Sequence, residues 1–267
     1  AGEDMPLMRA RYNNVNINPG GIVDAYVKTT KQPTTDSFQV VCTKAAGATI
    51  YKGTVPVDCV LHVDRVIVNG TALETFNVTF GSTDEGMIPP AAARLSVNQT
   101  TEISFELAGS AAVTATVFCT YIPGIRQLQE YIDDDAEHFV GQDTKVKAAV
   151  PVEVGFRCCY AAPEMLSDDQ MSLLKNTIED YINSIPVGTK TINFSDVRKV
   201  CASALPSVDL RLPCVMTGKV YTKSGDTDTF HNNTGLFDIS DPTNLDYWDF
   251  QECYFSACVD RIVVEAV

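Results

Sequence analysis

The 267-residue sequence has little basic charge, with 20 Lys and Arg residues against 34 Asp and Glu residues and a formal net charge of -14. A protein that binds the phosphates of a nucleic acid needs a face rich in Lys and Arg. No such cluster is visible, because the acidic residues are spread over the whole length of the chain. The composition therefore argues against a nucleic-acid partner, and we attribute the acidic surplus to solubility.

Long hydrophobic runs are also lacking. No apolar stretch approaches the roughly 18 to 20 residues that a membrane-spanning helix needs. The first residues do not combine a basic region with a following apolar region, as a signal peptide does. The sequence thus predicts a soluble chain without a membrane partner. Because position 1 is an alanine within a polar stretch, we expect a fragment or processed product that lacks an N-terminal part.

The cysteines lack the even number and regular spacing of a disulfide framework. Nine are present, and most stand in apolar, strand-like surroundings such as VVCT and VFCTY. We therefore predict small buried hydrophobic residues with free thiols in a reducing cytosol. Two groupings carry a zinc hypothesis: Cys158 with Cys159, and Cys253 with Cys258 and either Cys201 or Cys214. Because adjacent strand residues point to opposite faces and structural zinc sites use closer pairs on turns, we expect no metal and no cofactor.

Residues 22–122 combine β-branched and aromatic residues with frequent Gly, Pro, Asn and Asp breaks, which is typical of a run of short strands. The predicted strands are 22–29, 37–43, 49–52, 60–68, 74–80, 94–97, 101–106 and 112–121. The clearest turn is Asn69-Gly70, because Asn-Gly between two strands favours a type I′ hairpin. The spacing predicts a mainly antiparallel, sandwich-like β domain.

A different periodicity begins after Pro123-Gly124. Apolar residues recur at helical spacing from Ile125 to Phe139, with Gln, Glu and Asp on the other face, so we predict an amphipathic connecting helix. The acidic run at 133–135 raises a calcium or magnesium hypothesis, but three consecutive helical residues fan out around the axis. A solvated helix face is the simpler interpretation.

Residues 147–267 alternate strand and helix patterns. Strands are predicted over 149–160, 208–222 and 253–264, and the last two enclose a polar excursion. Two amphipathic helical patterns lie between the first two strands. This order predicts a small two-layer α+β domain with its helices on one face of a sheet.

Capping residues mark where these two helices begin. Ser167 followed by Gln170 forms the capping-box pattern, and Pro186 ends the helix that it starts. Ser195 is the predicted cap of the second helix, which Pro206 stops. The two helices are therefore separate elements joined by a short link.

Together these patterns predict an α+β fold class in four segments. They are an extended polar arm over 1–21, a β-rich domain over 22–122, a connecting helix and linker over 123–146, and the α+β domain over 147–267. The length suffices for two domains of about 100 to 150 residues, each with its own core.

Two segments of the chain, in this order, carry a family resemblance. In residues 3–29 the stretch EDMPLMRARYNNVNI leads to the Gly-Gly strand segment GGIVDAYVKT. Residues 130–202 contain the strand segment DTKVKAAVPV, a helix ending in YIN and a Ser-capped second helix. The chain thereby resembles the J-like wedge proteins of phage tail baseplates over nearly its whole length. It departs from them at the cysteine-rich strands and at the insert 223–251.

The resemblance implies a structural subunit without catalytic residues. Such a subunit assembles in several copies around the tail hub and couples fibre or receptor engagement to the tail. Its implied partners are other copies of itself and other wedge, hub and fibre-attachment proteins. Its implied location is the tail baseplate of a virion that is assembled in the cytoplasm of a host bacterium.

The aromatic residues Tyr247, Trp248 and Phe250 are concentrated in one polar loop. Because aromatic side chains often anchor interfaces, we predict that these three contact a partner. The alternative for Trp248, the only tryptophan, is that it covers the sheet of its own domain.

Flexible joints are predicted where glycine or proline stands between elements. Gly20 and Gly21 precede the first strand, Pro123 and Gly124 precede the connecting helix, and Gly141 follows its apolar stripe. The alternative is that these residues only end a strand or a helix.

Two other function classes remain open from the residues alone. A hydrolase could use carboxylates that surround Trp248, namely Asp238, Asp241, Asp246, Asp249 and Glu252. A carbohydrate- or receptor-binding module could stack a sugar on the loop aromatics. The three histidines, His62, His138 and His231, are too scattered in sequence to suggest a metal trio or a catalytic base.

Overall fold

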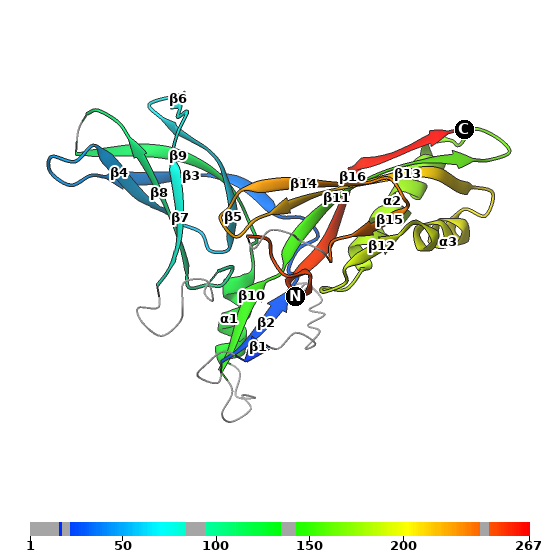
Figure 1. Ribbon diagram of the computed structural model, residues 1–267, viewed down its shortest axis with the longest axis horizontal. Helices are drawn as coiled ribbons and strands as arrows, with labels where there is room; N and C mark the ends of the chain where they lie inside the picture. The colour runs from blue at the N-terminus through cyan, green and yellow to red at the C-terminus, as the bar shows by residue number, and fades with distance from the viewer. Residues whose placement is uncertain (1–15, 18–21, 84–93, 110, 135–142, 241–245) are drawn as a thin grey trace, which may run out of the picture. The chain divides into compact units, whose positions relative to one another are not determined.

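The computed structural model describes residues 16–17, 22–83, 94–109, 111–134, 143–240 and 246–267 (Figure 1). The chain divides into two compact units. Unit 1 comprises Ala1–Ala149 with Thr222–Asp226, and unit 2 comprises Val150–Tyr221 with Thr227–Val267. Mostly antiparallel sheets form both units, and helices are few in the described part of the chain.

The larger sheet of unit 1 has seven antiparallel strands in the order β6-β5-β9-β3-β4-β8-β7. They are β3 (Thr34–Thr43), β4 (Ile50–Val55), β5 (Val60–Val68), β6 (Thr71–Ala72), β7 (Asn77–Ser82), β8 (Gln99–Glu106) and β9 (Ala112–Tyr121). Strands β3 and β4 pair only through Thr43 and Lys52, and residues from both sides of this junction fill one core. The β-rich character predicted for residues 22–122 is therefore confirmed.

A close approach at the junction between β3 and β4 explains a glycine in β4. A Cβ atom at Gly53 would lie 2.6 Å from the Sγ atom of Cys42 and 2.7 Å from a methyl carbon of Val40. Both distances are too short for real contacts, so only glycine lets the two strands cross at this spacing.

Local sequence signals for strands and hairpins were accurate in unit 1. The strands predicted over 60–68 and 112–121 match β5 and β9 residue for residue. Asn69 and Gly70 have φ angles of 52° and 78°, as the predicted type I′ turn requires.

The strand predicted over residues 94–97 is wrong. Leu95 has a φ angle of 58°, and its N–H donates to Oε1 of Gln99 over 2.7 Å. Arg94 is buried, donates to backbone carbonyls of β5, and places its guanidinium carbon 3.5 Å from the ring centroid of Phe80. Buried polar side chains hold this segment as a turn, and the sequence pattern did not reveal them.

The smaller sheet of unit 1 has the order β1-β2-β10 and joins distant parts of the sequence. Its strands are β1 (Asn16–Ile17), β2 (Ile22–Val27) and β10 (Asp143–Ala148), with β2 and β10 parallel. A helix, α1 (Ile125–Asp134), packs against β10. Residues 135–139 of the predicted helix lie outside the described residues. The sequence analysis assigned most of β10 to a linker, because its partner strand is far away in the chain.

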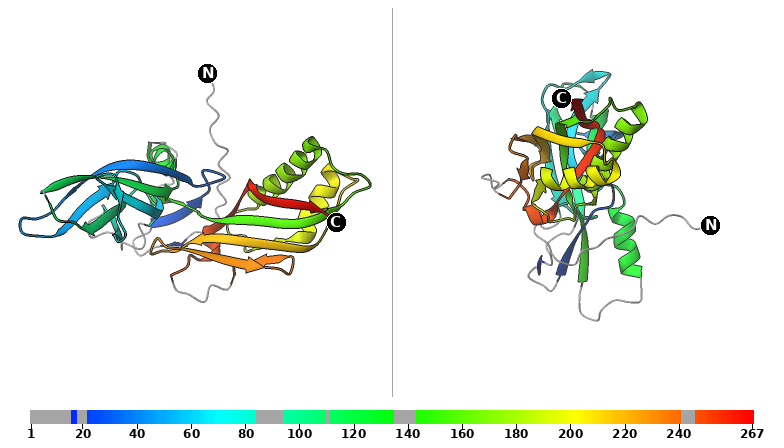
Figure 2. Two further views of the ribbon diagram at one scale, coloured as in Figure 1. Left: turned by 90° about the horizontal axis from the view of Figure 1, so that it is seen from above. Right: turned by 90° about the vertical axis from the view of Figure 1, so that its right-hand side faces the viewer.

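Unit 2 is built on a four-stranded sheet with the order β14-β13-β11-β16. Its strands are β11 (Val150–Ala161), β13 (Asp209–Tyr221), β14 (Thr227–Asn232) and β16 (Cys253–Ala266). β16 runs parallel to β11, and the other neighbours are antiparallel. The helices α2 (Asp168–Ser184) and α3 (Phe194–Ala204) lie over one face of this sheet (Figure 2).

Two short strands and a helical turn complete unit 2. β12 (Thr191–Asn193) pairs with β15 (Leu236–Asp238), and the 3-10 turn η1 (Phe250–Glu252) precedes β16. Both β14 and β15 lie inside the predicted polar excursion. Their sequences, TDTFHN and LFD, are too polar or too short to carry a strand signal of their own.

The helix caps separate a confirmed prediction from a wrong one. Ser167 and Gln170 exchange side-chain to backbone hydrogen bonds of 3.0 and 3.3 Å, so the predicted capping box of α2 is confirmed. The predicted cap of α3 is wrong, because Asn193 caps this helix by accepting the N–H of Ser195 over 2.9 Å. Burial of Phe194 in the first turn sets the earlier start. None of the helices in the described ranges is long and apolar enough to span a membrane.

Candidate functional site

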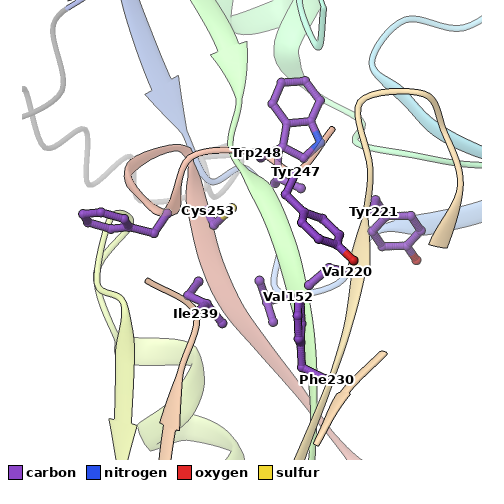
Figure 3. A pocket seen from close by; sticks show the side chains of 10 residues that line it. Val152, Val220, Tyr221, Phe230, Ile239, Tyr247, Trp248 and Cys253 are labelled. Atoms are coloured by element: carbon purple, nitrogen blue, oxygen red, sulfur yellow. The ribbon is translucent and has the colours of Figure 1, made fainter. Parts of the chain in front are cut away.

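The loop of the predicted interface residues Tyr247, Trp248 and Phe250 lies against the sheet of unit 2. Figure 3 shows Tyr247 near Val220 of β13, and Tyr247, Trp248 and Val152 of β11 are among the residues that line the same cavity. This cavity is small and mainly apolar, with a volume of about 30 Å³. Pockets for small molecules usually measure roughly 300 to 1,000 Å³. This cavity therefore suits the packing of the loop better than the binding of a ligand.

Trp248 is buried, with 8% of its surface exposed. Trp248 is one of the residues that line the cavity formed with β11 and β13, which fits the alternative that Trp248 covers the sheet of its own domain. A side chain buried to this degree offers a partner little surface. The part of the predicted interface that remains accessible is formed by Tyr247 and Phe250, which are half-buried.

Tyr247 connects the loop to β14, the outer strand of the sheet. Its phenol donates a hydrogen bond to the carboxylate of Asp228 on β14. Its ring lies 5.5 Å from that of Phe230, also on β14, at an interplanar angle of 54°. The hydrogen bond from Tyr247 lowers the pKa of Asp228 and raises the pKa of Tyr247 itself. An aromatic pair and a carboxylate are thus held together at the edge of unit 2.

Among the carboxylates of the hydrolase hypothesis, two form local turns. Asp238 accepts the N–H of Ser240 over 2.8 Å, and hydrogen bonds from Ser240 lower the pKa of Asp238. Asp249 accepts the N–H of Gln251 over 2.9 Å and caps η1. Asp241 lies outside the described residues. Both carboxylates bond nearby backbone N–H groups and so stabilise local turns. They give the hydrolase hypothesis no support.

Unit 1 closes one strand edge with a side-chain amide, a role that the sequence analysis missed. Gln129 of α1 donates to the carbonyl of Thr144 over 3.0 Å and accepts the N–H of Val146 over 2.7 Å. A residue of a parallel strand would bond the same two groups of β10. Further along, the N–H of Ala148 donates to the carbonyl of Leu95. The outer edge of β10 is therefore bonded at Thr144, Val146 and Ala148.

Unit 2 closes an edge in a related way. Asn183 of α2 donates to the carbonyl of Ala257 and accepts its N–H, each over 3.0 Å. These two bonds reproduce the hydrogen-bonded pair of an antiparallel neighbour. The carbonyl of Cys253, further back on β16, accepts the N–H of Gly188 over 2.9 Å. An Asn or Gln on the half-buried side of an amphipathic helix was the only sequence signal for these contacts.

Each unit also contains a buried carboxylate that the sequence analysis did not single out. In unit 1, Asp24 of β2 contacts Nζ of Lys147 on β10 over 2.6 Å. In unit 2, Glu153 of β11 accepts the phenol of Tyr221 and pairs with Arg261 in an irregular part of β16. These groups join neighbouring strands within each unit and therefore stabilise the sheets.

The predicted joint at Pro123 and Gly124 is held inside unit 1. The hydroxyl of Thr29 donates to the carbonyl of Pro123 over 2.7 Å. Gly124 has a φ angle of 89°, and its carbonyl accepts the N–H of Leu128 in the first turn of α1. Gly20, Gly21 and Gly141 lie outside the described residues. The hinge hypothesis stays a prediction.

The described cysteines are free thiols, most of them buried. Burial raises the pKa of Cys201 to about 11 and that of Cys214 to about 12, which disfavours the thiolate that zinc would need. Within the ranges that the structure describes, no three Cys, His, Asp or Glu side chains are grouped to hold a metal ion. His62 contacts the carbonyl of Gly225 through Nδ1, whereas His231 lies on β14 and His138 is outside the described residues.

No protein-family model matches the chain, and a search of curated protein sequences finds no significant match. The strand edges and the loop at β14 are therefore the observations from which a function can be argued.

Proposed function

We propose that this chain is a structural subunit of a bacteriophage tail baseplate wedge of the J-like kind. In this proposal several copies assemble around the tail hub and couple fibre or receptor engagement to the tail. α1 serves as a connecting helix, and unit 2 serves as a small two-layer α+β domain. The chain acts without catalytic residues, in contact with other wedge, hub and fibre-attachment proteins, and it belongs to the virion.

One observation supports the structural part of the proposal: side chains bond the outer edges of some sheets, and another edge is left exposed. Carboxamides bond part of the outer edges of β10 and β16, at Thr144 and Val146 and at Ala257, whereas β14 presents an exposed strand beside the Tyr247 and Phe230 rings. Open strand edges are sites where another chain can add to a sheet. The baseplate assignment rests on the order of the segments 3–29 and 130–202 in the sequence.

A carbohydrate- or receptor-binding module is the second candidate, because Tyr247 and Phe250 are half-buried in one loop. The burial of Trp248 and the cavity of about 30 Å³ weigh against it, since neither leaves a broad platform for a sugar ring. Glycan-array binding by the purified chain, lost in Tyr247→Ala, would favour this module over the wedge.

The test of the proposed function is averaged electron microscopy of a virus particle that carries the chain. The proposal expects several symmetry-related copies at the base of the tail, into which the folds of units 1 and 2 fit separately. Density for these folds at the capsid or at the distal end of a fibre would overturn it.

A further inference from the structure

The outer edge of β14 is exposed and regular. β14 pairs with β13 over six consecutive residues without a bulge, and the turn between them closes with the N–H of Thr222 donating to the carbonyl of Asp226. In an antiparallel ladder, residues bonded to the neighbouring strand alternate with residues whose backbone groups face away. The outward residues of β14 are therefore Thr227, Thr229 and His231, and all three side chains are exposed.

This strand differs from the edges that the molecule closes. In the described part of the chain, no backbone group bonds the outward positions of β14. The only contact to them is local, because Oδ1 of Asp228 accepts the N–H of Thr229 over 2.7 Å. β14 also contains no proline and no lysine, the residues that commonly discourage pairing at an edge. Figure 2 shows β14, in orange, at the outer side of the sheet of unit 2.

The sequence of β14 is complementary to itself. In an antiparallel pair with a two-fold axis at Thr229, this residue faces its own copy, and Thr227 faces His231 of the other chain. Asp228 faces Phe230, so no like charges oppose each other, and Thr–Thr pairs are favourable neighbours across strands. The outward groups of Thr227 and His231 become bonded without displacing any described backbone contact.

The same pairing engages the aromatic residues at this edge. Phe230 and Tyr247 form a half-buried pair on the face of the sheet that carries the loop (Figure 3). When Phe230 lies opposite Asp228 of a second chain, it approaches the Tyr247 that donates to that carboxylate. Two such pairs then meet near the two-fold axis and bury apolar surface that a single chain leaves half exposed.

We infer that β14 is the contact through which a second copy of this chain binds, edge to edge and antiparallel, with the two-fold axis at Thr229. The two sheets of unit 2 join into one continuous sheet of eight strands. Each Thr229 N–H exchanges its bond with Asp228 for a bond to the carbonyl of the facing Thr229. The role of this contact in a virus particle rests on the proposed function. The pairing itself is a property of the chain and can be measured on the purified protein.

Charged residues introduced at Thr229, on the two-fold axis, test the inference on the full-length protein. Thr229→Asp and Thr229→Lys each place like charges opposite each other in a homodimer, and each should raise the dimer dissociation constant about ten-fold or more. The Lys variant should dimerise least, because Lys219 of β13 is the neighbour of Thr229. Mixing the two variants should restore a dimer that contains one chain of each kind. Analytical ultracentrifugation and native mass spectrometry measure these masses.

Two further variants separate loss of pairing from loss of folding. Thr229→Pro removes an outward N–H that β13 does not use, so it should abolish the dimer and leave Trp248 fluorescence unchanged. Thr229→Val keeps the N–H and should dimerise as the unaltered chain does. A monomeric unaltered chain, or variants that dimerise equally and form no preferred mixed pair, would overturn the inference.

The outcomes for the contact and for the proposed function are distinguishable. If the chain is absent from tail baseplates but Thr229→Asp and Thr229→Lys form the mixed dimer, the contact stands and the baseplate proposal fails. If the chain occupies the baseplate and Thr229→Pro assembles there with normal copy number and unchanged dimer mass, the contact fails and the baseplate proposal stands.

Discussion

Among the described residues, each unit buries one carboxylate between neighbouring strands, but the cations that contact the two carboxylates differ in exposure. In unit 1 the side chains of Asp24 and Lys147 are each only 4% exposed. In unit 2 the side chain of Glu153 is also 4% exposed, but that of Arg261 is 44% exposed. Glu153 also accepts a hydrogen bond from Tyr221. The cation that contacts the carboxylate is therefore buried in unit 1 and solvent-facing in unit 2, where a phenol also bonds the carboxylate.

The two closed edges allow a second comparison. Gln129 bonds β10 as a parallel strand would, and Asn183 bonds β16 as an antiparallel strand would. In both units a helix supplies the amide, so a helix that packs beside an edge can also block it. Among the described residues, no helix side chain bonds the outer side of β14, and its edge differs from the other two in this respect.

The largest expected effect comes from Lys147→Met in unit 1. Removing the cation that contacts the buried Asp24 carboxylate should lower the free energy of unfolding of unit 1 by about 3–5 kcal/mol. Hydrogen exchange at the amides of β2 and β10, followed by mass spectrometry, measures the loss. Lys52→Met is the matched control in an exposed pair with Glu102, and it should change the stability by about 1 kcal/mol or less. Equal losses in both variants would contradict the role given to burial.

A smaller effect is expected from Arg261→Met in unit 2. Glu153 keeps the phenol of Tyr221, and Arg261 is partly solvated, so the loss should be about 1–3 kcal/mol. Fluorescence of Trp248, the only tryptophan and a buried residue of unit 2, reports this unfolding in urea. Arg157→Met, in an exposed pair with Glu265, serves as the control. If Arg261→Met lowered the free energy of unfolding as much as Lys147→Met does, the expected difference between the two buried carboxylates would be wrong.

Replacing the edge-closing amides should cost about 1–2 kcal/mol each, because each variant loses two hydrogen bonds to a strand. Gln129→Leu should destabilise unit 1, and Asn183→Leu should destabilise unit 2. Both should also raise the tendency to self-associate, since each opens a strand edge. The exposed residues Gln127 and Asn176 lie on the same two helices, and Gln127→Leu and Asn176→Leu should leave stability and solution mass nearly unchanged.

The smallest effect concerns an exposed ion pair in unit 2. Hydrogen bonding from Arg198, with a further bond from Arg211, lowers the pKa of Asp209 below its ordinary value near 3.8. The folded state therefore binds this proton less readily than the unfolded state. The contribution of Asp209 to stability is present above the ordinary pKa and is lost as the pH falls through the lower value. Asp209→Asn should flatten the fall in melting temperature between about pH 5 and pH 3 slightly. An unchanged slope would show that this pair contributes nothing measurable.

Part of the candidate site could be predicted from the sequence and part could not. The loop that holds Tyr247, Trp248 and Phe250 was located by its aromatic residues, but the sequence left open whether Trp248 faces a partner or its own sheet. Its 8% exposure favours the second alternative. β14, the strand beside this loop, was missed because only Phe230 among its six residues is strongly apolar. A strand signal in the sequence depends on alternating burial, which an edge strand often lacks.

The sequence by itself determined the elements whose signals are local. Alternating apolar residues defined β5 and β9, Asn69-Gly70 defined a hairpin, and Ser167 with Gln170 defined the start of α2. These signals suffice because each acts over a few neighbouring residues, through backbone preference or a short hydrogen bond.

Only the tertiary structure decided which residues share an edge or a buried charge. β10 meets β2 across most of unit 1, Lys147 meets Asp24 between them, and Asn183 reaches Ala257 from another element. Such contacts join residues far apart in the chain, and no local pattern fixes their partners. Burial then determines their energetic weight, because a charge or an amide removed from water depends on the groups that the fold places beside it.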